Sequence, residues 1–194
     1  MWKSLAIVAL LITLSPVSAW AQRRAPAVRP RVRPVPSAGM NAVGISAGVA
    51  LPSEELFSKG PTLAVSAEHY FSARVSLRGQ LSGAFWHFTD FEEDTSRPVA
   101  VTGDVVYNWE RGTWHPYVMA GVGFYKFRFK EADFDASDSA IGLNFGGGAE
   151  YFLSRHDSLT GEVTVHAISG DATGRFADYG TSYWTITGGY KKYF

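Results

Sequence analysis

The residues of this sequence that come nearest to a catalytic pair are a histidine and a serine, His166 and Ser169. A histidine that contacts a serine can activate its hydroxyl for nucleophilic attack. The surrounding residues alternate as in a strand, and a spacing of three places the two side chains on opposite faces. The remaining histidines, which show no metal-ligand spacing, are His69, His87, His115 and His156. The sequence therefore predicts no catalytic residues.

Carboxylates are grouped in two polar segments, with Asp90, Glu92, Glu93 and Asp94 in the first and Glu131, Asp133, Asp135 and Asp138 in the second. In the second group, Asp133, Asp135 and Asp138 could offer oxygen ligands to a calcium ion. The second group lacks both the glycine and the distal glutamate of an EF-hand loop. We therefore interpret both groups as solvated loops, and we predict neither a metal site nor a cofactor.

A third set of ionisable residues lies within alternating segments rather than between them. Opposite charges on one polar face can pair across a narrow interior, and removal of one partner would strand the other. The sequence therefore predicts a luminal polar network, with a narrow ion path as the alternative. The predicted members are Glu68, Arg78, Asp104, Lys126, Arg128, Glu150 and Glu162.

Eight segments with period-two alternation provide the elements that would position these side chains. Each is close to the ~9–11 residues that a tilted membrane-crossing strand requires. The segments cover roughly residues 41–50, 61–71, 74–87, 98–109, 116–129, 139–153, 158–169 and 181–194. After residue 21 no apolar run approaches 18 residues, so we predict no transmembrane helix.

Aromatic residues and connection lengths favour a membrane barrel over a soluble one. The connections near 72–73, 110–115 and 154–157 are short, whereas those near 51–60, 88–97, 130–138 and 170–180 are longer and polar. Aromatic residues gather near the segment ends, as in interfacial girdles. The predicted girdle residues are Tyr70, Phe71, Phe85, Trp86, Phe88, Tyr107, Trp109, Tyr117, Tyr125, Phe127, Tyr151, Phe152, Tyr183, Trp184, Tyr193 and Phe194. The sequence thus predicts an all-β fold, an eight-stranded antiparallel up-and-down transmembrane β-barrel whose last strand pairs with its first.

The N-terminal region differs from the rest of the chain. Residues 1–21 combine Lys3, an apolar run and an Ala-Trp-Ala cleavage site, and we interpret them as a signal peptide. Residues 22–39 contain four prolines and five arginines and are predicted to form a disordered periplasmic tail. Residues 40–194 carry 12 basic and 18 acidic residues, and this negative charge argues against nucleic acid as a partner.

Residues 40–194 resemble the OmpA/OmpX-like family of small eight-stranded outer-membrane β-barrels. The matching pieces are residues 43–48, 115–123 and 146–151 and the terminal aromatic residue. The resemblance implies an outer membrane of the Gram-negative type, contact with its lipid and lipopolysaccharide, and recognition of the last strand by the barrel-assembly machinery. We expect Tyr190 and Phe194 to form this assembly signal. Lys126 and Arg128 could meet lipopolysaccharide phosphates instead of the lumen.

The resemblance leaves the activity open, since small barrels serve as adhesins, anchors and enzymes. We predict a monomer with a structural or surface-interaction (adhesin-like) role, which binds an extracellular ligand through its outer loops and has no catalytic activity. One alternative is a lipid A deacylase-like enzyme, a family with a His-x-Ser pair where this chain has His166 and Ser169. The other is a narrow channel, although side chains can fill an eight-stranded interior.

Overall fold

A computed structural model describes residues 36–53, 58–87, 95–109, 112–131, 134–169 and 181–194, with the backbone alone described at 87, 95–96, 128–131 and 134–138. The wall strands are β1 (Asn41–Pro52), β2 (Gly60–Tyr70), β3 (Val75–Ala84), β6 (Val99–Asn108), β7 (Trp114–Glu131), β8 (Phe134–Phe152), β9 (Asp157–Ser169) and β10 (Thr181–Tyr193). Two short strands, β4 (Trp86–His87) and β5 (Thr95–Ser96), lie at one end. The described residues contain no helix long and apolar enough to cross a membrane.

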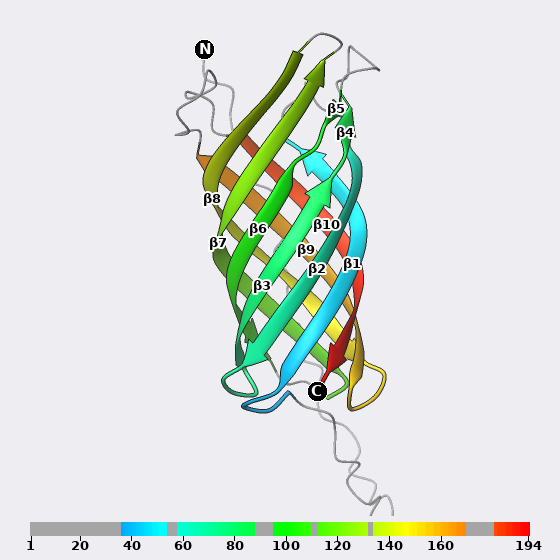
Figure 1. The fold of residues 1–194 in the computed structure, drawn as a ribbon. Coiled ribbons are helices and arrows are strands. Elements are labelled where there is room, and N and C mark those ends of the chain that lie inside the picture. Colours follow the sequence, from blue (N-terminus) through cyan, green and yellow to red (C-terminus); the bar gives the residue numbers. More distant parts are fainter. Residues whose placement is uncertain (1–35, 54–57, 88–94, 110–111, 132–133, 170–180) are drawn as a thin grey trace, which may run out of the picture. The chain divides into compact units, whose positions relative to one another are not determined.

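The eight wall strands form a closed antiparallel barrel, which confirms the predicted fold (Figure 1). Each strand pairs with the next wall strand along the chain, and β10 returns to pair with β1 from Ala42↔Tyr193 to Pro52↔Tyr183. The seam continues to the rim, where the Asn41 N–H donates to the Phe194 carbonyl at 2.9 Å. Closure gives the seam strands backbone partners, as a wall in lipid requires.

The two ends of the barrel differ in their connections. At the turn end, which also carries Asn41 and Phe194, tight turns follow β2 and β8. The Phe71 N–H donates to the Val75 carbonyl at 2.9 Å in the first of these turns. The opposite end, here called the loop end, carries β4, β5 and the paired ends of β7 and β8 (Figure 1).

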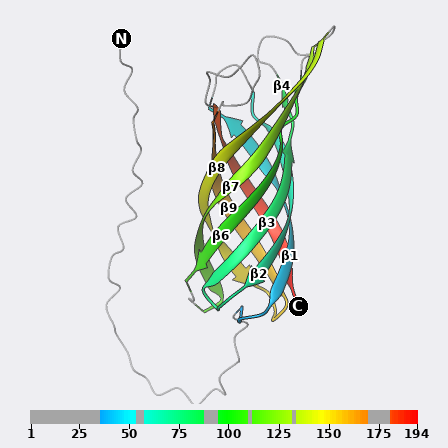
Figure 2. The same ribbon diagram turned by 60° about the vertical axis from the view of Figure 1, so that its left-hand side comes forward.

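The β7–β8 hairpin projects beyond the loop end. β7 and β8 have 18 and 19 residues, against 10 to 13 in the other wall strands. Their pairing continues to Glu131↔Phe134, although β6 leaves β7 at Val99↔Lys126. The prediction of a long loop over 130–138 was therefore wrong, because the strand ladder persists past the rim. Figure 2 shows the hairpin rising above the neighbouring strands.

Period-two alternation gives the wall an apolar outer face and a largely polar inner face. In β6, Val101 and Val105 are exposed on the outside, whereas Thr102 and Asp104 are buried in the lumen. An outer face built in this way suits lipid, and the polar inner residues must then find partners within the barrel.

Adjacent aromatic residues divide between the two faces, and this corrects the predicted girdles. Tyr183 is buried and Trp184 is exposed, because successive side chains of a strand point in opposite directions. The aromatic residues that lie inside are Tyr70, Trp86, Tyr117, Tyr125, Phe127, Phe152, Tyr183 and Tyr193. Those that face outward are Phe71, Phe85, Tyr107, Trp109, Tyr151, Trp184 and Phe194, while Phe88 lies outside the described residues.

The first described residues contact the turn end of the barrel. Pro36 is fully buried, and the Gly39 N–H donates to the Tyr70 carbonyl at 2.8 Å. Gly39 has a φ of 86°, in the left-handed region that favours glycine. Residues 36–39 are therefore held against the barrel, contrary to the prediction that a free tail extends to residue 39. The predicted signal peptide and the rest of the tail lie outside the described residues.

Candidate functional site

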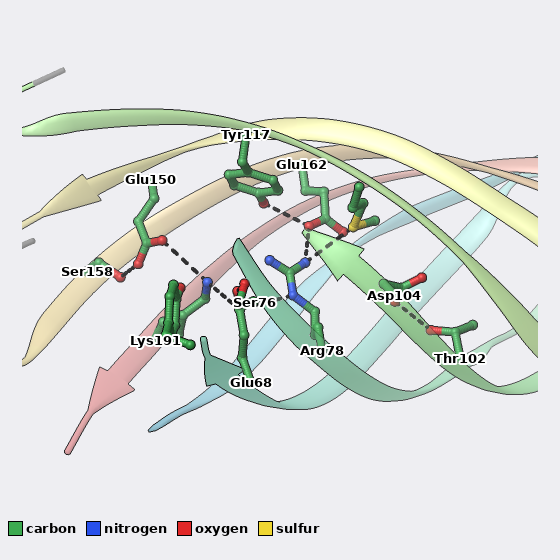
Figure 3. A network of polar contacts seen from close by, with 12 residues as sticks. Glu68, Ser76, Arg78, Thr102, Asp104, Tyr117, Glu150, Ser158, Glu162 and Lys191 are labelled. Carbon is green, nitrogen blue, oxygen red and sulfur yellow. Dashed lines mark hydrogen bonds and ion pairs between the residues drawn. The ribbon is translucent and has the colours of Figure 1, made fainter. Parts of the chain in front are cut away.

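The centre of the lumen holds two cations that share one carboxylate (Figure 3). The Arg78 Nε on β3 lies 3.2 Å from Glu68 Oε2 on β2, and the Lys191 Nζ on β10 lies 2.9 Å from the same oxygen. Ser76 also donates a hydrogen bond to Glu68. The ion pairs link β2, β3 and β10. All these side chains are buried, so the pairs lie in a site of low dielectric constant.

Glu162 on β9 extends this network across the lumen. Its Oε2 accepts hydrogen bonds from Arg78 Nη1 at 2.6 Å and from the Tyr117 hydroxyl at 2.7 Å. The Arg78 guanidinium also lies over the Tyr117 ring, 5.2 Å from its centroid. Arg78 therefore binds two carboxylates and one aromatic face, a combination that suits the planar guanidinium.

Glu150 on β8 connects the network to the turn end. Its Oε2 lies 3.3 Å from Lys191 Nζ, and its Oε1 accepts hydrogen bonds from Ser158 and Tyr193. Lys191 thus neutralises charge on Glu150 as well as on Glu68. Removal of this lysine would leave buried Glu150 without a cation and Glu68 with Arg78 alone.

Asp104 forms a separate carboxylate group nearer the loop end. It accepts hydrogen bonds from Asn144 and from the Thr102 hydroxyl, the latter at 3.0 Å. Burial raises the electrostatic cost of this charge, and the two hydrogen bonds offset part of it. With Asp104 included, each of the four luminal carboxylates accepts at least two hydrogen bonds, so the arrangement binds the strands together.

Aromatic side chains close the lumen on both sides of the polar centre. At the loop end, Tyr183 stacks on His166 with 4.4 Å between ring centroids and meets Trp86 edge-on at 5.2 Å. The His166 Nδ1 and the Tyr125 hydroxyl are hydrogen-bonded at 2.9 Å. At the turn end, Tyr193 contacts Tyr70 and Phe152 with centroid distances of 5.8 and 5.4 Å.

A small cavity remains beside Arg78 and Glu162. Its volume is about 20 Å³, and its other lining residues include Ser46, Ser66 and Thr187. A space of this size with polar walls suits about one water molecule. The interior is thus packed with side chains along its polar centre.

We expect the purified protein to show no single-channel current steps in planar bilayers, because side chains fill the lumen. The control is a bilayer that received detergent without protein. Reproducible steps from the wild-type protein, absent from that control, would contradict the packed interior and restore the channel alternative.

Comparisons with known proteins can be set beside this architecture. The family model for the outer membrane protein β-barrel domain matches residues 7–191. The chain belongs to this family. A search of curated proteins found no match.

Solved structures of outer-membrane barrels share the fold at low sequence identity. Neisserial surface protein A is 16% identical with a TM-score of 0.65, over 79% of this chain and 98% of that chain. The N-terminal barrel of OprF from Pseudomonas aeruginosa is 17% identical with a TM-score of 0.56, over 80% and 99%. Ail of Yersinia pestis is 14% identical with a TM-score of 0.54, over 79% and 99%. These structures share the fold, and with the family match they identify the chain as a small outer-membrane β-barrel protein.

In this outer-membrane barrel the lumen gathers five of the seven predicted network residues, namely Glu68, Arg78, Asp104, Glu150 and Glu162. The luminal prediction was wrong for Lys126, which is exposed on the outer face of β7. Its neighbours Tyr125 and Phe127 are buried inside, so alternation directs the lysine outward. The side chain of Arg128 lies outside the described residues.

Lys191 is the main network residue that the sequence prediction missed. It contacts two glutamates, yet it lies in a Tyr-Lys-Lys-Tyr segment where either lysine could face the lumen. Strict alternation from the inward Tyr183 would have identified Lys191, because the two positions differ by an even number of residues.

The candidate catalytic pair is divided by the wall of the outer-membrane barrel. His166 is buried in the lumen and Ser169 is exposed on the outer face, so they do not form a nucleophile–base pair. Among the described residues there is also no cluster of three metal-ligating side chains. Asp90, Glu92, Glu93, Asp94 and Asp133 lie outside the described residues, as do the side chains of Asp135 and Asp138.

Tyr190 and Phe194, the predicted assembly signal, both lie on the outer face near the turn end of the outer-membrane barrel. The Tyr190 hydroxyl donates to Asp157, whose carboxylate also lies 2.9 Å from Lys192 Nζ. These contacts join β10 to β9 at the rim. The role of Tyr190 and Phe194 in assembly stays a prediction.

Proposed function

We propose that this outer-membrane protein is a surface-interaction protein whose loop end faces the cell exterior and binds a partner there. The observation that carries the proposal is the β7–β8 hairpin, which continues past the rim to Glu131↔Phe134. β5 pairs with one edge of the hairpin, at Thr95↔Lys130 and Ser96↔Phe129. A paired, projecting strand ladder can present a binding surface away from the lipid headgroups.

The packed lumen supports this proposal, because it leaves the outside of the barrel for interactions. Closure of the sheet also supports a monomer, since within the barrel each described wall strand pairs with a neighbour on both sides. The separation of His166 from Ser169 supports a role without catalysis.

Charge indicates the class of partner. The sequence between β1 and β2 (53–59), between β3 and β6 (88–97) and between β9 and β10 (170–180), together with residues 130–138 of the β7–β8 hairpin, contains 12 acidic and four basic residues. Ail of Yersinia pestis has been crystallised with sucrose octasulfate, a heparin analogue, which is a polyanion. The acidic segments of the present chain would repel such a ligand, so we propose a positively charged partner.

A shortened hairpin tests this proposal. Residues 129–136 are replaced by Asn-Gly, which joins the paired positions Arg128 and Ser137 through a two-residue turn. Binding of protein-containing nanodiscs is measured on polylysine-coated and heparin-coated surfaces. We expect the wild type to prefer polylysine, with binding that weakens as salt is added, and the shortened variant to bind polylysine several-fold less.

The control for this experiment is the thermal unfolding of both proteins, because a shortened hairpin must leave the barrel intact. Preference of the wild type for heparin would refute the cationic partner. Equal polylysine binding by the wild type and a folded, shortened variant would show that the hairpin is not the binding surface.

A further inference from the structure

Three cations on the outer face of the barrel differ in whether they form an ion pair. At the turn end, Lys192 Nζ lies 2.9 Å from Asp157 Oδ1. At the loop end, Arg97 and Lys126 are exposed, and neither forms an ion pair with another described residue. A cation on the lipid-facing side of a barrel is unfavourable unless a polar group meets it.

Arg97 and Lys126 are near neighbours on this outer face. Lys126 lies directly opposite Val99 in the β6–β7 ladder, and Arg97 precedes Val99 by two residues. Arg97 is exposed and the intervening Pro98 is buried, so the alternation of β6 extends to Arg97. Diagonal positions of this kind are about 7–8 Å apart, a separation that one anionic group between two long side chains can bridge.

The Arg97 guanidinium is held against the barrel wall. Its Cζ lies 5.7 Å from the ring centroid of Phe85, an exposed residue directly after β3. Stacking of this type fixes the plane of the guanidinium and leaves its N–H donors available at the edges.

An apolar groove begins beside Lys126 and runs over β7, β8 and β9. Phe124, Ile141, Leu143, Ala167, Ser139 and Ser169 line most of it, and its volume is about 680 Å³. Ala167, opposite Leu143 in the β8–β9 ladder, contributes only a methyl group to this wall. Lys126 lies opposite Ser139 in the β7–β8 ladder, so the lysine is the neighbour of a lining residue.

We propose that Arg97 and Lys126 bind the phosphate of an outer-leaflet lipid whose acyl chain occupies this groove. The choice of leaflet rests on the proposed function, in which the loop end faces outward. Arginine and lysine together suit a phosphate, since one offers paired donors and the other a compact charge. The groove has the volume of small-molecule sites and an apolar wall that matches an acyl chain.

The test measures lipid A retained by the full-length protein in detergent, by native mass spectrometry across a lipid A titration. Arg97→Gln/Lys126→Gln removes the two charges, and Ala167→Phe fills the groove. We expect each variant to bind lipid A at least about tenfold more weakly than the wild type. Lys192→Gln is the matched control, an outward lysine at the opposite rim, and should bind as the wild type does.

Two further binding measurements separate the contribution of the lipid A phosphates from that of its acyl chains. Lipid A without its phosphates should bind the wild type about as weakly as phosphorylated lipid A binds the charge variant. Millimolar inorganic phosphate should fail to displace lipid A, because the acyl chain contributes to binding. Unchanged lipid A binding by Arg97→Gln/Lys126→Gln, or full displacement by inorganic phosphate, would overturn the proposal. Lipid A binding in detergent is independent of the polylysine result, so either proposal can fail alone.

Discussion

Lys191→Met should destabilise the barrel far more than Lys192→Met. Lys191 is only 4% exposed and lies within 2.9 and 3.3 Å of oxygens on Glu68 and Glu150. Methionine keeps much of the volume but leaves buried Glu150 without a cation and Glu68 with Arg78 alone. Loss of one partner from a buried pair typically costs about 3–5 kcal/mol.

The measurement is the free energy of unfolding in lipid vesicles, from urea titrations followed by tryptophan fluorescence. Lys192 is the matched control, because solvent screens its exposed pair with Asp157, which should contribute little to stability. Adding Glu150→Gln to Lys191→Met should restore part of the lost stability, since it removes one stranded charge. Equal free energies for the two lysine variants would refute the luminal network as a stabilising element.

Tyr183→Ala is expected to have the second largest effect. Tyr183 is 3% exposed, stacks on His166 and contacts the edges of Trp86 and Tyr125. Its truncation would empty the centre of the loop-end aromatic layer. Large aromatic-to-alanine changes in packed interiors typically cost about 3–5 kcal/mol, because the surroundings collapse only partly.

The neighbouring Trp184→Ala provides the comparison for Tyr183→Ala. Trp184 removes a larger side chain from the next position of the same strand, but it is 48% exposed on the outer face. Lipid can fill the space that it leaves, so its effect on urea unfolding should be clearly smaller. A larger loss for Trp184→Ala would show that the outer aromatic residues, rather than the inner layer, hold this rim together.

The strands could be predicted because each segment shows period-two alternation in its own sequence. Alternation in β3 and β6 assigns every residue to one of two faces without reference to any other strand, and closure follows from the need to satisfy backbone groups in lipid. The same local rule placed Glu68, Arg78 and Glu162 on the luminal face.

The predictions for the aromatic girdles and for Lys126 were wrong where the inner and outer faces of a strand carry similar residues. Where an aromatic pair such as Tyr183–Trp184 ends a strand, composition alone does not say which ring faces lipid. Lys126 was assigned to the lumen because it is charged, although the aromatic layer occupies the inner positions beside it. Only the phase of the alternation, carried along the whole strand, resolves such cases.

Contacts between strands required the structure. Whether Lys191 reaches both Glu68 and Glu150 depends on the register of β10 against β1 and β9, and no single segment contains that information. The extension of the β7–β8 hairpin was missed for a related reason. Its outer part is polar and lies beyond the rim, so the apolar face that marks a strand in lipid is missing there.

The bond between Glu68 and Lys191 joins residues 123 positions apart, and it has a consequence for folding. Glu68 belongs to the second strand and Lys191 to the last, so this ion pair cannot form before the seam closes. Until then both charges need water, and the lumen must stay hydrated. Drying of the interior and pairing of β10 with β1 are thus one step, and partly closed barrels should be sparsely populated during unfolding.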